Sequence, residues 1–389
     1  MSPTNSPLSR RDFLTRAAIL GIGGPAFLAA CSSSKKATPS TAASGPGSGE
    51  TGTAAAVGTV HIASWPFYIE NDQNPAKSPT IIGFEKATGN KVDYKIAIDD
   101  NTSFTAKFEG DLKKGSGIGF DIAIPTSWMV SRWIQKGWAE ELPNDLIPNK
   151  KNLLNRLANP SWDPNRAHSL PYAEGQVGIA YYPDKVGFEI TSMADFLKPE
   201  LKGKTTILSE MRDGIGMFLL QMGLKPEEAT VEQCLAAIAQ VKNYRDAGQF
   251  RKITGNGYIE DLGSGDTIAA MAWSGDVAGL QQSNPDIVWV LPKEGAMSFV
   301  DTMVIPKGGN TELAAAWMNW IYDPAVSGPL FEAISYVSPV KGAVDNMTAA
   351  GQKNPMINPP ANADIHAFRD LSEDEAKQIE AAFVAATQQ

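Results

Sequence analysis

The chain has 389 residues, of which 43% are hydrophobic and 20% are charged, and its formal net charge is −9 at pH 7. This length is more than one small core needs and indicates about two domains. The acidic balance argues against nucleic acid as a partner, because phosphate binding requires clustered Lys and Arg. It is compatible with a cationic ligand.

The first thirty residues have the features of an export signal. The segment SRRDFL at 9–14 precedes a weakly apolar run over 17–29, which is shorter than the roughly twenty residues that a membrane span needs. The two arginines indicate a twin-arginine-type signal (Tat), and Leu28-Ala29-Ala30-Cys31 resembles the lipobox of bacterial lipoproteins. We expect residues 1–30 to be removed and a lipidated Cys31 to anchor the protein on the outer face of the cytoplasmic membrane.

Residues 31–57 are rich in Ser, Thr, Ala, Gly and Pro and lack periodic apolar residues. Such a segment cannot offset the entropy lost on ordering, so we expect a disordered tether. Beyond Cys31 the chain has one further cysteine, Cys234. Without a second thiol no intramolecular disulfide can form, and its apolar surroundings predict a buried thiol.

From Thr59 onward, strand patterns alternate with helical patterns. The strands are expected at 59–65, 91–98, 120–125, 204–208, 267–273, 286–291 and 299–305. Helical spacing occurs at 81–89, 104–115, 213–223, 231–244, 311–322, 325–335 and 372–387. This alternation predicts right-handed βαβ units and therefore an α/β fold with a mostly parallel sheet.

The sequence lacks the motifs of common catalytic and metal sites, which leaves only metal-free acid/base catalysis by paired carboxylates open. The three histidines, His61, His168 and His366, have neither HExxH nor zinc-site spacing. There is no G-x-S-x-G elbow and no P-loop, and the GSGIG segment at 115–119 is better explained as a turn between a helix and a strand. We therefore expect neither an enzyme nor a cofactor or metal.

Aromatic, acidic and polar side chains follow the ends of the predicted strands, where α/β sheets bind ligands. In MAWSGDVAG at 271–279, Trp273 is either a packing residue or a wall of such a site. An acid after a strand, such as Asp213, can alternatively cap a helix. The residues that follow strand ends are Trp65, Tyr68, Thr126, Trp128, Glu210, Asp213 and Trp273, whereas Phe299 and Asp301 bracket the start of the predicted strand TMVIP.

From about Thr59 to the C-terminus the chain resembles the spermidine/putrescine-binding proteins of bacterial ABC importers. The segments that carry the resemblance, in the family's order and spacing, are SWPFYIE, FDIAIPTSW, LPYAEG, FLKPELKGK, MAWSG, PKEGAMSFVDTMVIP and ISYVSPV. The resemblance implies a type II periplasmic-binding-protein fold, in which each of two lobes is a mostly parallel sheet flanked by helices and the ligand lies in the cleft between them.

The resemblance also implies the roles of individual residues. A polyamine joins ammonium groups by methylenes, so its site combines carboxylates with stacked rings. The implied aromatic box is Trp65, Tyr68, Trp128, Trp273, Phe299 and Tyr336. The implied ammonium ligands are Glu210, Asp213 and Asp301, with Thr126 as a polar wall.

Three positions depart from the family's pattern. Phe67 replaces an acid, Arg369 replaces a glutamine that is expected near the tail, and Glu174 replaces an aromatic residue and could add an acid. A missing acid and an added Arg weaken the case for a long triamine. Putrescine, a guanidino compound such as agmatine, an opine and an amino-acid derivative therefore stay open as ligands.

We expect lobe one to comprise 58–176 and 300–345, and lobe two 180–298 and 346–389, with hinges in GQVGIAYY (175–182) and EGAMSF (294–299). The implied partners are a small polyamine, ABC permease subunits and the membrane through the lipid anchor, and we expect a monomer. A lipid-anchored sensor with the same fold is the alternative that the sequence leaves open.

Overall fold

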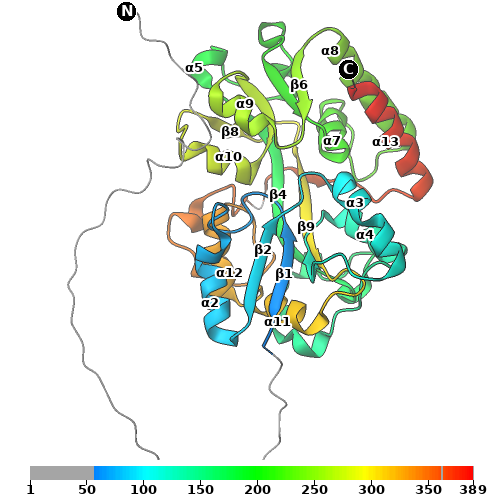
Figure 1. The fold of residues 1–389 in the computed structure, drawn as a ribbon. Coiled ribbons are helices and arrows are strands. Elements are labelled where there is room, and N and C mark those ends of the chain that lie inside the picture. The colour runs from blue at the N-terminus through cyan, green and yellow to red at the C-terminus, as the bar shows by residue number, and fades with distance from the viewer. Residues whose placement is uncertain (1–56, 361, 389) are drawn as a thin grey trace, which may run out of the picture. The chain divides into compact units, whose positions relative to one another are not determined.

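The structure, a computed structural model, describes residues 57–360 and 362–388 (Figure 1). The predicted signal peptide, Cys31 and all of the predicted tether except Val57 lie outside the described residues. Within the part of the chain that is described, the longest helices are too short or too polar to cross a membrane.

The described residues form ten strands and twelve α-helices. The strands are β1 (Thr59–Ser64), β2 (Lys91–Ile96), β3 (Ile122–Ala123), β4 (Ser169–Tyr181), β5 (Thr205–Leu208), β6 (Phe250–Thr254), β7 (Ala269–Trp273), β8 (Val288–Val290), β9 (Ala296–Val304) and β10 (Ile365–Ala367). The helices are α2 (Pro79–Thr88), α3 (Asn101–Lys114), α4 (Ser127–Gln135), α5 (Pro183–Val186), α6 (Met193–Phe196), α7 (Met211–Gln221), α8 (Val231–Asp246), α9 (Tyr258–Ser264), α10 (Ser274–Gln281), α11 (Thr311–Ile321), α12 (Pro324–Ile334) and α13 (Glu373–Thr387).

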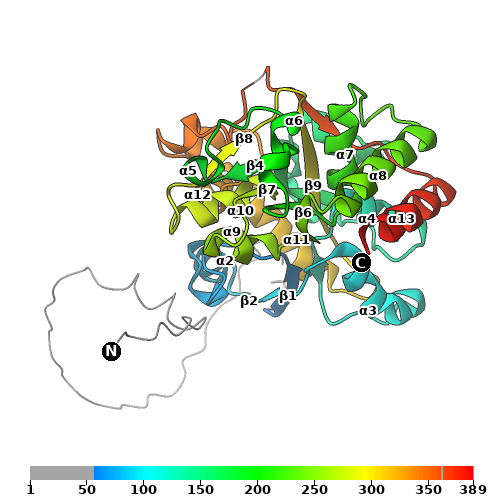
Figure 2. The same ribbon diagram turned by 90° about the horizontal axis from the view of Figure 1, so that it is seen from above.

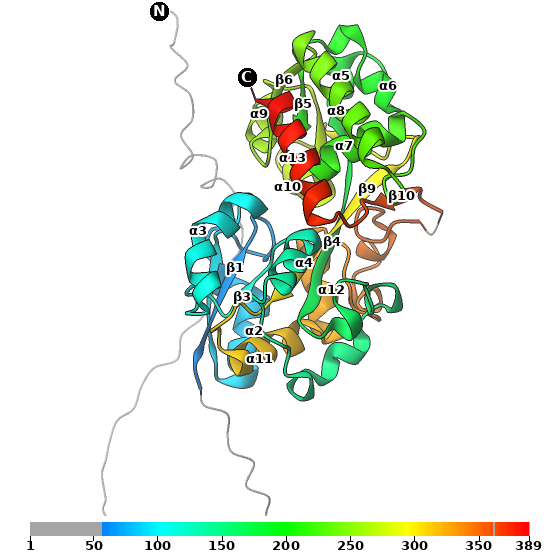
Figure 3. The ribbon, with the colours of Figure 1, turned by 90° about the vertical axis from the view of Figure 1, so that its right-hand side faces the viewer.

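One sheet runs through both lobes in the order β2-β1-β3-β9-β4-β7-β5-β6. β1 is parallel to β2 and β3, and β5 is parallel to β6 and β7, which confirms the predicted α/β fold. At the junction, β4 is antiparallel to both β9 and β7. Figure 3 shows β4 and β9 passing from one lobe to the other, so the sheet is continuous between the lobes.

The two lobes have separate hydrophobic cores. Helices α2, α11 and α12 cover the core of lobe one, where Phe84, Trp317 and Phe331 are fully buried. The core of lobe two includes Phe218 of α7 and Cys234 of α8, which confirms the predicted buried thiol. Helices α8 and α13 lie side by side on this lobe (Figure 2).

β4 contributes to both cores, because Leu170 and Tyr172 pack in lobe one whereas Val177 and Ile179 pack in lobe two. Where β4 crosses between the lobes, Gly175 lies opposite Phe299 of β9. A Cβ atom on this glycine would lie 2.2 Å from the Phe299 ring. A larger residue would therefore displace Phe299.

The segment assigned to lobe two from residue 346 has contacts in both lobes. Met347 and Ile357 pack in the core of lobe one, whereas Met356 and Phe383 pack in that of lobe two. The detailed lobe bounds and the hinge positions therefore remain a proposal.

Candidate ligand-binding cleft

A cleft of about 740 Å³ lies between the two lobes. The residues that line it come from α3, α4, α7, β7, α10, β9 and β10 and from the connections between elements. All eleven predicted ligand-binding residues are among them: Trp65, Tyr68, Thr126, Trp128, Glu210, Asp213, Trp273, Phe299, Asp301, Tyr336 and Arg369. Strand ends from both lobes thus converge on one site, as the fold predicts.

Asp301 projects from β9 at the base of the cleft and is 3% exposed. Its Oδ2 atom accepts a hydrogen bond from the Tyr68 hydroxyl. Its Oδ1 atom is buried and has no hydrogen-bond partner among the described residues. Burial raises the pKa of Asp301 to about 7, while the bond from Tyr68 and the nearby Thr126 side chain oppose this shift. A donor that reached Oδ1 would stabilise the ionised carboxylate.

Asp276 is a second buried acid of the cleft, and sequence reasoning missed it. It lies in the first turn of α10, where Oδ2 accepts bonds from the Tyr258 hydroxyl at 2.7 Å and from Asn256 Nδ2 at 3.0 Å. The Tyr336 hydroxyl donates to Oδ1 at 3.4 Å. Burial raises the pKa of Asp276 to about 6. Its position in MAWSGDVAG, just past the end of β7, was the available signal.

Glu210 and Asp213 stand at the N-terminus of α7. Glu210 is the N-cap and accepts a hydrogen bond from the Arg212 backbone N–H at 3.4 Å. Asp213 follows in the first turn, so the alternative in which Asp213 caps this helix is wrong. Instead its Oδ2 accepts a bond from Trp273 Nε1 at 2.8 Å. Burial raises the pKa of both carboxyls, and the neighbouring acids raise it further.

Aromatic rings form a continuous wall between these acids. Trp273, the last residue of β7, contacts Phe299 edge to face with ring centroids 6.4 Å apart, and Phe299 contacts Tyr336 in the same way at 6.4 Å. Tyr336 in turn packs against Tyr68 at 4.9 Å. Trp273 therefore lines the cleft while its ring is also held in place. Trp65 also lines the cleft and is fixed by a hydrogen bond that its Nε1 donates to the Ile124 carbonyl at 2.7 Å.

Two predicted residues of lobe one, Thr126 and Trp128, contact polar or charged side chains of the protein itself. Thr126 Oγ1 accepts a hydrogen bond from Asn101 Nδ2 at 2.9 Å. The ring of Trp128 in α4 is in contact with two guanidinium groups, that of Arg212 at 4.0 Å from the ring centroid and that of Arg132 at 4.8 Å. Arg212 also lines the cleft and was missed from sequence.

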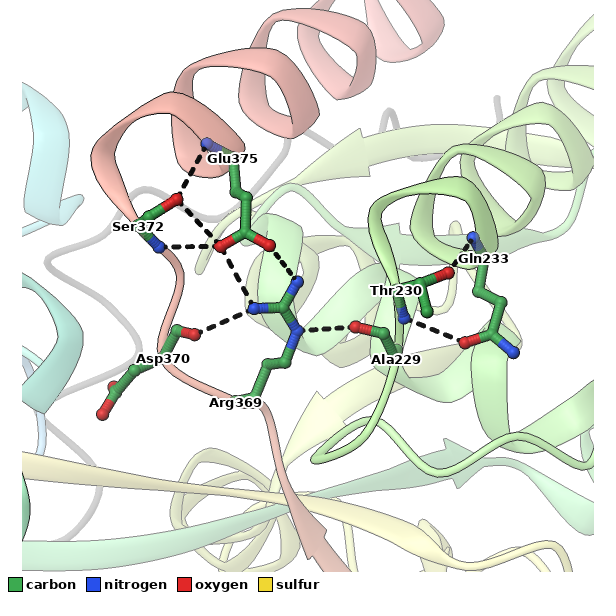
Figure 4. A network of polar contacts seen from close by, with 7 residues as sticks. All are labelled: Ala229, Thr230, Gln233, Arg369, Asp370, Ser372 and Glu375. Carbon is green, nitrogen blue, oxygen red and sulfur yellow. Dashed lines mark hydrogen bonds and ion pairs between the residues drawn. The ribbon is translucent and has the colours of Figure 1, made fainter.

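Arg369 lies at the edge of the cleft, but its guanidinium is held within lobe two (Figure 4). Nε donates to the Ala229 carbonyl at 2.6 Å and Nη2 donates to Glu375 Oε1 at 2.6 Å. Glu375 also completes the capping box of α13 with Ser372. Arg369 thus ties the start of α13 to the segment before α8, and its charge is balanced by Glu375.

The other two departures lie outside the cleft lining. Glu174 of β4 forms a bidentate ion pair with Arg156, so it does not supply an added acid. Phe67 has a left-handed backbone (φ 60°), is 37% exposed, and donates its backbone N–H to Asp72. A Cβ atom on Gly279 of α10 would lie 3.8 Å from the Phe67 ring, which places this ring beside lobe two.

Eight acidic side chains and four arginines line the cleft. Three of these arginines, Arg156, Arg212 and Arg369, pair with glutamates that are not part of the lining. The fourth, Arg166, donates to the Leu157 carbonyl at 2.7 Å. Acids therefore outnumber arginines in the lining, and three of the four arginines pair with glutamates outside it. Among residues 57–360 and 362–388, no cluster of His, Cys, Asp or Glu is suited to hold a metal ion.

A family model for bacterial extracellular solute-binding proteins matches residues 82–359, most of the chain. The chain belongs to this family. This solute-binding protein is 28% identical to the putrescine-binding periplasmic protein PotF of Escherichia coli over 330 residues, which cover 80% of this chain and 85% of PotF. It is also 28% identical over 337 residues to the putrescine-binding periplasmic protein SpuD of Pseudomonas aeruginosa, covering 80% and 87% of the two chains.

Among solved structures, the solute-binding protein is similar to the spermidine/putrescine substrate-binding protein PotD of Streptococcus pneumoniae. The TM-score is 0.70 with 20% identity, and the similarity covers 84% of this chain and 98% of that chain. At this identity the similarity shows the fold, which is the predicted two-lobe periplasmic-binding-protein fold. The family consists of solute-binding proteins and not of enzymes, in agreement with the prediction.

Proposed function

We propose that this solute-binding protein is the extracytoplasmic substrate-binding component of an ABC importer and that its cleft captures a polyamine, putrescine or spermidine. The observation that carries the proposal is the buried Asp301 Oδ1 atom, which has no partner among the described residues and lies in a cleft of aromatic rings and excess acids. A buried carboxylate oxygen without a donor is costly, and an ammonium group supplies both the donor and the charge.

In this proposal one ammonium group binds between Asp301 and Asp276 at the base of the cleft. The methylene chain then lies along the wall of Tyr336, Phe299 and Trp273, and the second ammonium group binds at Asp213 with Glu210 beside it. Stacking of a cation on an indole contributes about 0.5–2 kcal/mol. Each charge-assisted hydrogen bond is stronger than a neutral one. The names of the relatives PotF and SpuD support the same class of ligand.

The proposal includes the anchor and the partners. Lipidation at Cys31 would hold the protein at the membrane through the 31–57 tether, as a monomer that delivers its ligand to ABC permease subunits. If so, Cys31→Ala should release the protein from the membrane fraction. A variant that stayed membrane-bound would contradict the anchor but not the ligand.

The ligand class is tested by a thermal-shift panel of putrescine, spermidine, agmatine, cationic amino acids, anionic amino acids and sugars. A ligand at one hundred times Kd stabilises the folded protein by about 2.7 kcal/mol. We expect the amines to raise the melting temperature. A shift with sugars or anions and none with amines would overturn the proposal.

A further inference from the structure

A contact between an indole ring and a guanidinium group joins the two lobes. Trp128 lies in α4 and packs against the hydrophobic cluster around Phe104 and Trp133 in lobe one. Arg212 lies in α7, whose residue Ile215 belongs to the core of lobe two. The Arg212 guanidinium is 4.0 Å from the centroid of the Trp128 ring. Because α4 and α7 belong to different lobes (Figure 3), this contact requires the lobes to be close together.

A carboxylate of lobe two lies between one guanidinium from each lobe. Glu380 is in α13, whose residue Ile379 belongs to the core of lobe two. Its Oε1 atom lies 2.6 Å from Nη2 of Arg132, which follows Trp128 by one turn of α4, and 3.4 Å from Nη1 of Arg212. One turn of α4 therefore makes two contacts with lobe two, through its ring and through its guanidinium.

The Arg212 guanidinium is almost completely removed from water. The residue is 8% exposed, and among the described residues its side chain donates hydrogen bonds only to Glu380, at 3.4 and 3.5 Å. Glu210 and Asp213 also interact with its charge, but without a hydrogen bond to this side chain. A cation over an indole is bound more strongly when it is desolvated. The Trp128 ring is therefore a substantial part of what holds this cation.

We propose that Trp128 and Arg212 form a clasp that holds the lobes closed, so that Trp128 affects ligand binding through Arg212 and not as a ring on which the ligand stacks. This role differs from the one that the family resemblance implies for Trp128, because the ring is already in contact with a cation of the protein. The clasp forms without ligand and stabilises the closed form. It therefore lowers the Kd of the ligand when the empty protein is mainly open.

The test is a double-mutant cycle with Trp128→Leu, Arg212→Gln and the double variant, in which the putrescine Kd is measured by calorimetry. The choice of putrescine rests on the proposed function. We expect the Kd of the double variant to be about fivefold to thirtyfold lower than the product of the two single effects predicts. Arg212→Gln also removes a charge near Glu210 and Asp213, but this direct effect occurs on both sides of the cycle and cancels.

The same cycle is measured on the empty protein, where the clasp changes the ratio of closed to open molecules. Spin labels at Lys86→Cys in α2 and Asn243→Cys in α8, both exposed positions on different lobes, report the distance between the lobes. If the empty protein is mainly closed, the coupling appears in this ratio instead of in the Kd. Absence of coupling in both quantities would overturn the clasp. If no amine binds, the proposed function fails, and the distance measurement alone decides about the clasp.

Two further variants separate the clasp from a general effect of cleft aromatics. Trp128→Phe keeps a ring and should retain most of the coupling with Arg212→Gln. Trp65→Leu is the matched control, because Trp65 lines the same cleft but donates its Nε1 hydrogen bond to the Ile124 carbonyl within lobe one. Its effect and that of Arg212→Gln should be additive. Equal coupling of Arg212 to Trp65 and to Trp128 would overturn the assignment.

Discussion

At the scale of single residues, a buried carboxylate with an unused oxygen costs free energy that a bound cation removes. Asp301 is such a residue. We predict that Asp301→Asn weakens putrescine binding by roughly 30- to 3,000-fold, because removing one member of a desolvated charge pair costs about 2–5 kcal/mol. Isothermal titration calorimetry measures this change directly.

The control for Asp301→Asn is Asp145→Asn, which removes the same charge from an exposed position outside the cleft. It should leave putrescine affinity unchanged within about twofold, since an exposed distant charge is screened. Equal affinities of Asp301→Asn and the unmodified protein would contradict the role given to Asp301.

A second prediction concerns Arg369. Because its guanidinium is bonded to Glu375 and to the Ala229 carbonyl, its replacement should change stability more than binding. We expect Arg369→Gln to lower the free energy of unfolding by about 1 kcal/mol, as for a partly exposed ion pair with a backbone hydrogen bond. Chemical denaturation measures this, and putrescine affinity is determined alongside it. A large change in affinity without a change in stability would place the charge in the ligand site instead.

The sequence predicted many of the cleft residues because they follow strand ends or match a family segment. It did not predict Asp276 or Arg212. Which side of a helix faces the cleft depends on how that helix packs, and the pairing of Arg212 with Trp128 joins distant segments. The prediction that Glu174 could add an acid failed for a similar reason, because its partner Arg156 comes from a loop that carries no periodic pattern.

At the scale of elements, an ion pair joins the two lobes away from the base of the cleft. Arg132 of α4 in lobe one bonds Glu380 of α13 in lobe two at 2.6 Å. We predict that Glu380→Gln favours a more open protein in the absence of ligand and weakens amine binding, since closure is linked to binding. Small-angle X-ray scattering would show a larger radius of gyration.

Glu109→Gln is the comparison for Glu380→Gln, because Glu109 pairs with Lys113 within α3 and this ion pair does not connect the two lobes. It should change neither the radius of gyration nor the affinity. If Glu380→Gln had no more effect than Glu109→Gln on either quantity, the ion pair between α4 and α13 would have no role in closure.

Helices and parallel strands were predictable from local periodicity, and the predicted helix at 372–387 is found as α13 with a capping box at its start. The antiparallel pairing of β4 with β9 was not predictable in this way. All thirteen residues of β4 are buried, so they show no alternation that would indicate a partner. The pairing follows from the passage of the chain between lobes, which is a property of the tertiary fold.

At the scale of the whole molecule, the buried acids predict how binding depends on pH. In the empty cleft burial raises the pKa of Asp301 to about 7 and that of Asp276 to about 6. Ammonium groups bind the ionised acids, so putrescine affinity should rise from about pH 5 to about pH 8 and binding should release protons. Titrations in buffers of different ionisation enthalpy measure the protons released.

The same shifts affect the stability of the empty protein in the opposite direction. An acid whose pKa is higher in the folded state contributes stability below its unfolded pKa, and this contribution is lost as pH rises through the folded pKa. The empty protein should therefore lose stability between about pH 4 and about pH 7 from these acids, and putrescine should restore it. The Asp301→Asn variant should lose less stability over this pH range, because it lacks one of these acids. An affinity that falls as pH rises to about 8 would contradict this account.

The central claim is that the cleft between the lobes is a site for a small polycation, held by Asp301, Asp276 and Asp213 against the aromatic wall. Calorimetric titration of the purified protein with putrescine near neutral pH tests it most directly. The account predicts saturable binding of one putrescine per chain, with release of protons and loss of this binding in Asp301→Asn. Absence of binding by putrescine and spermidine, together with binding of an anion or a sugar in the same cleft, would contradict it.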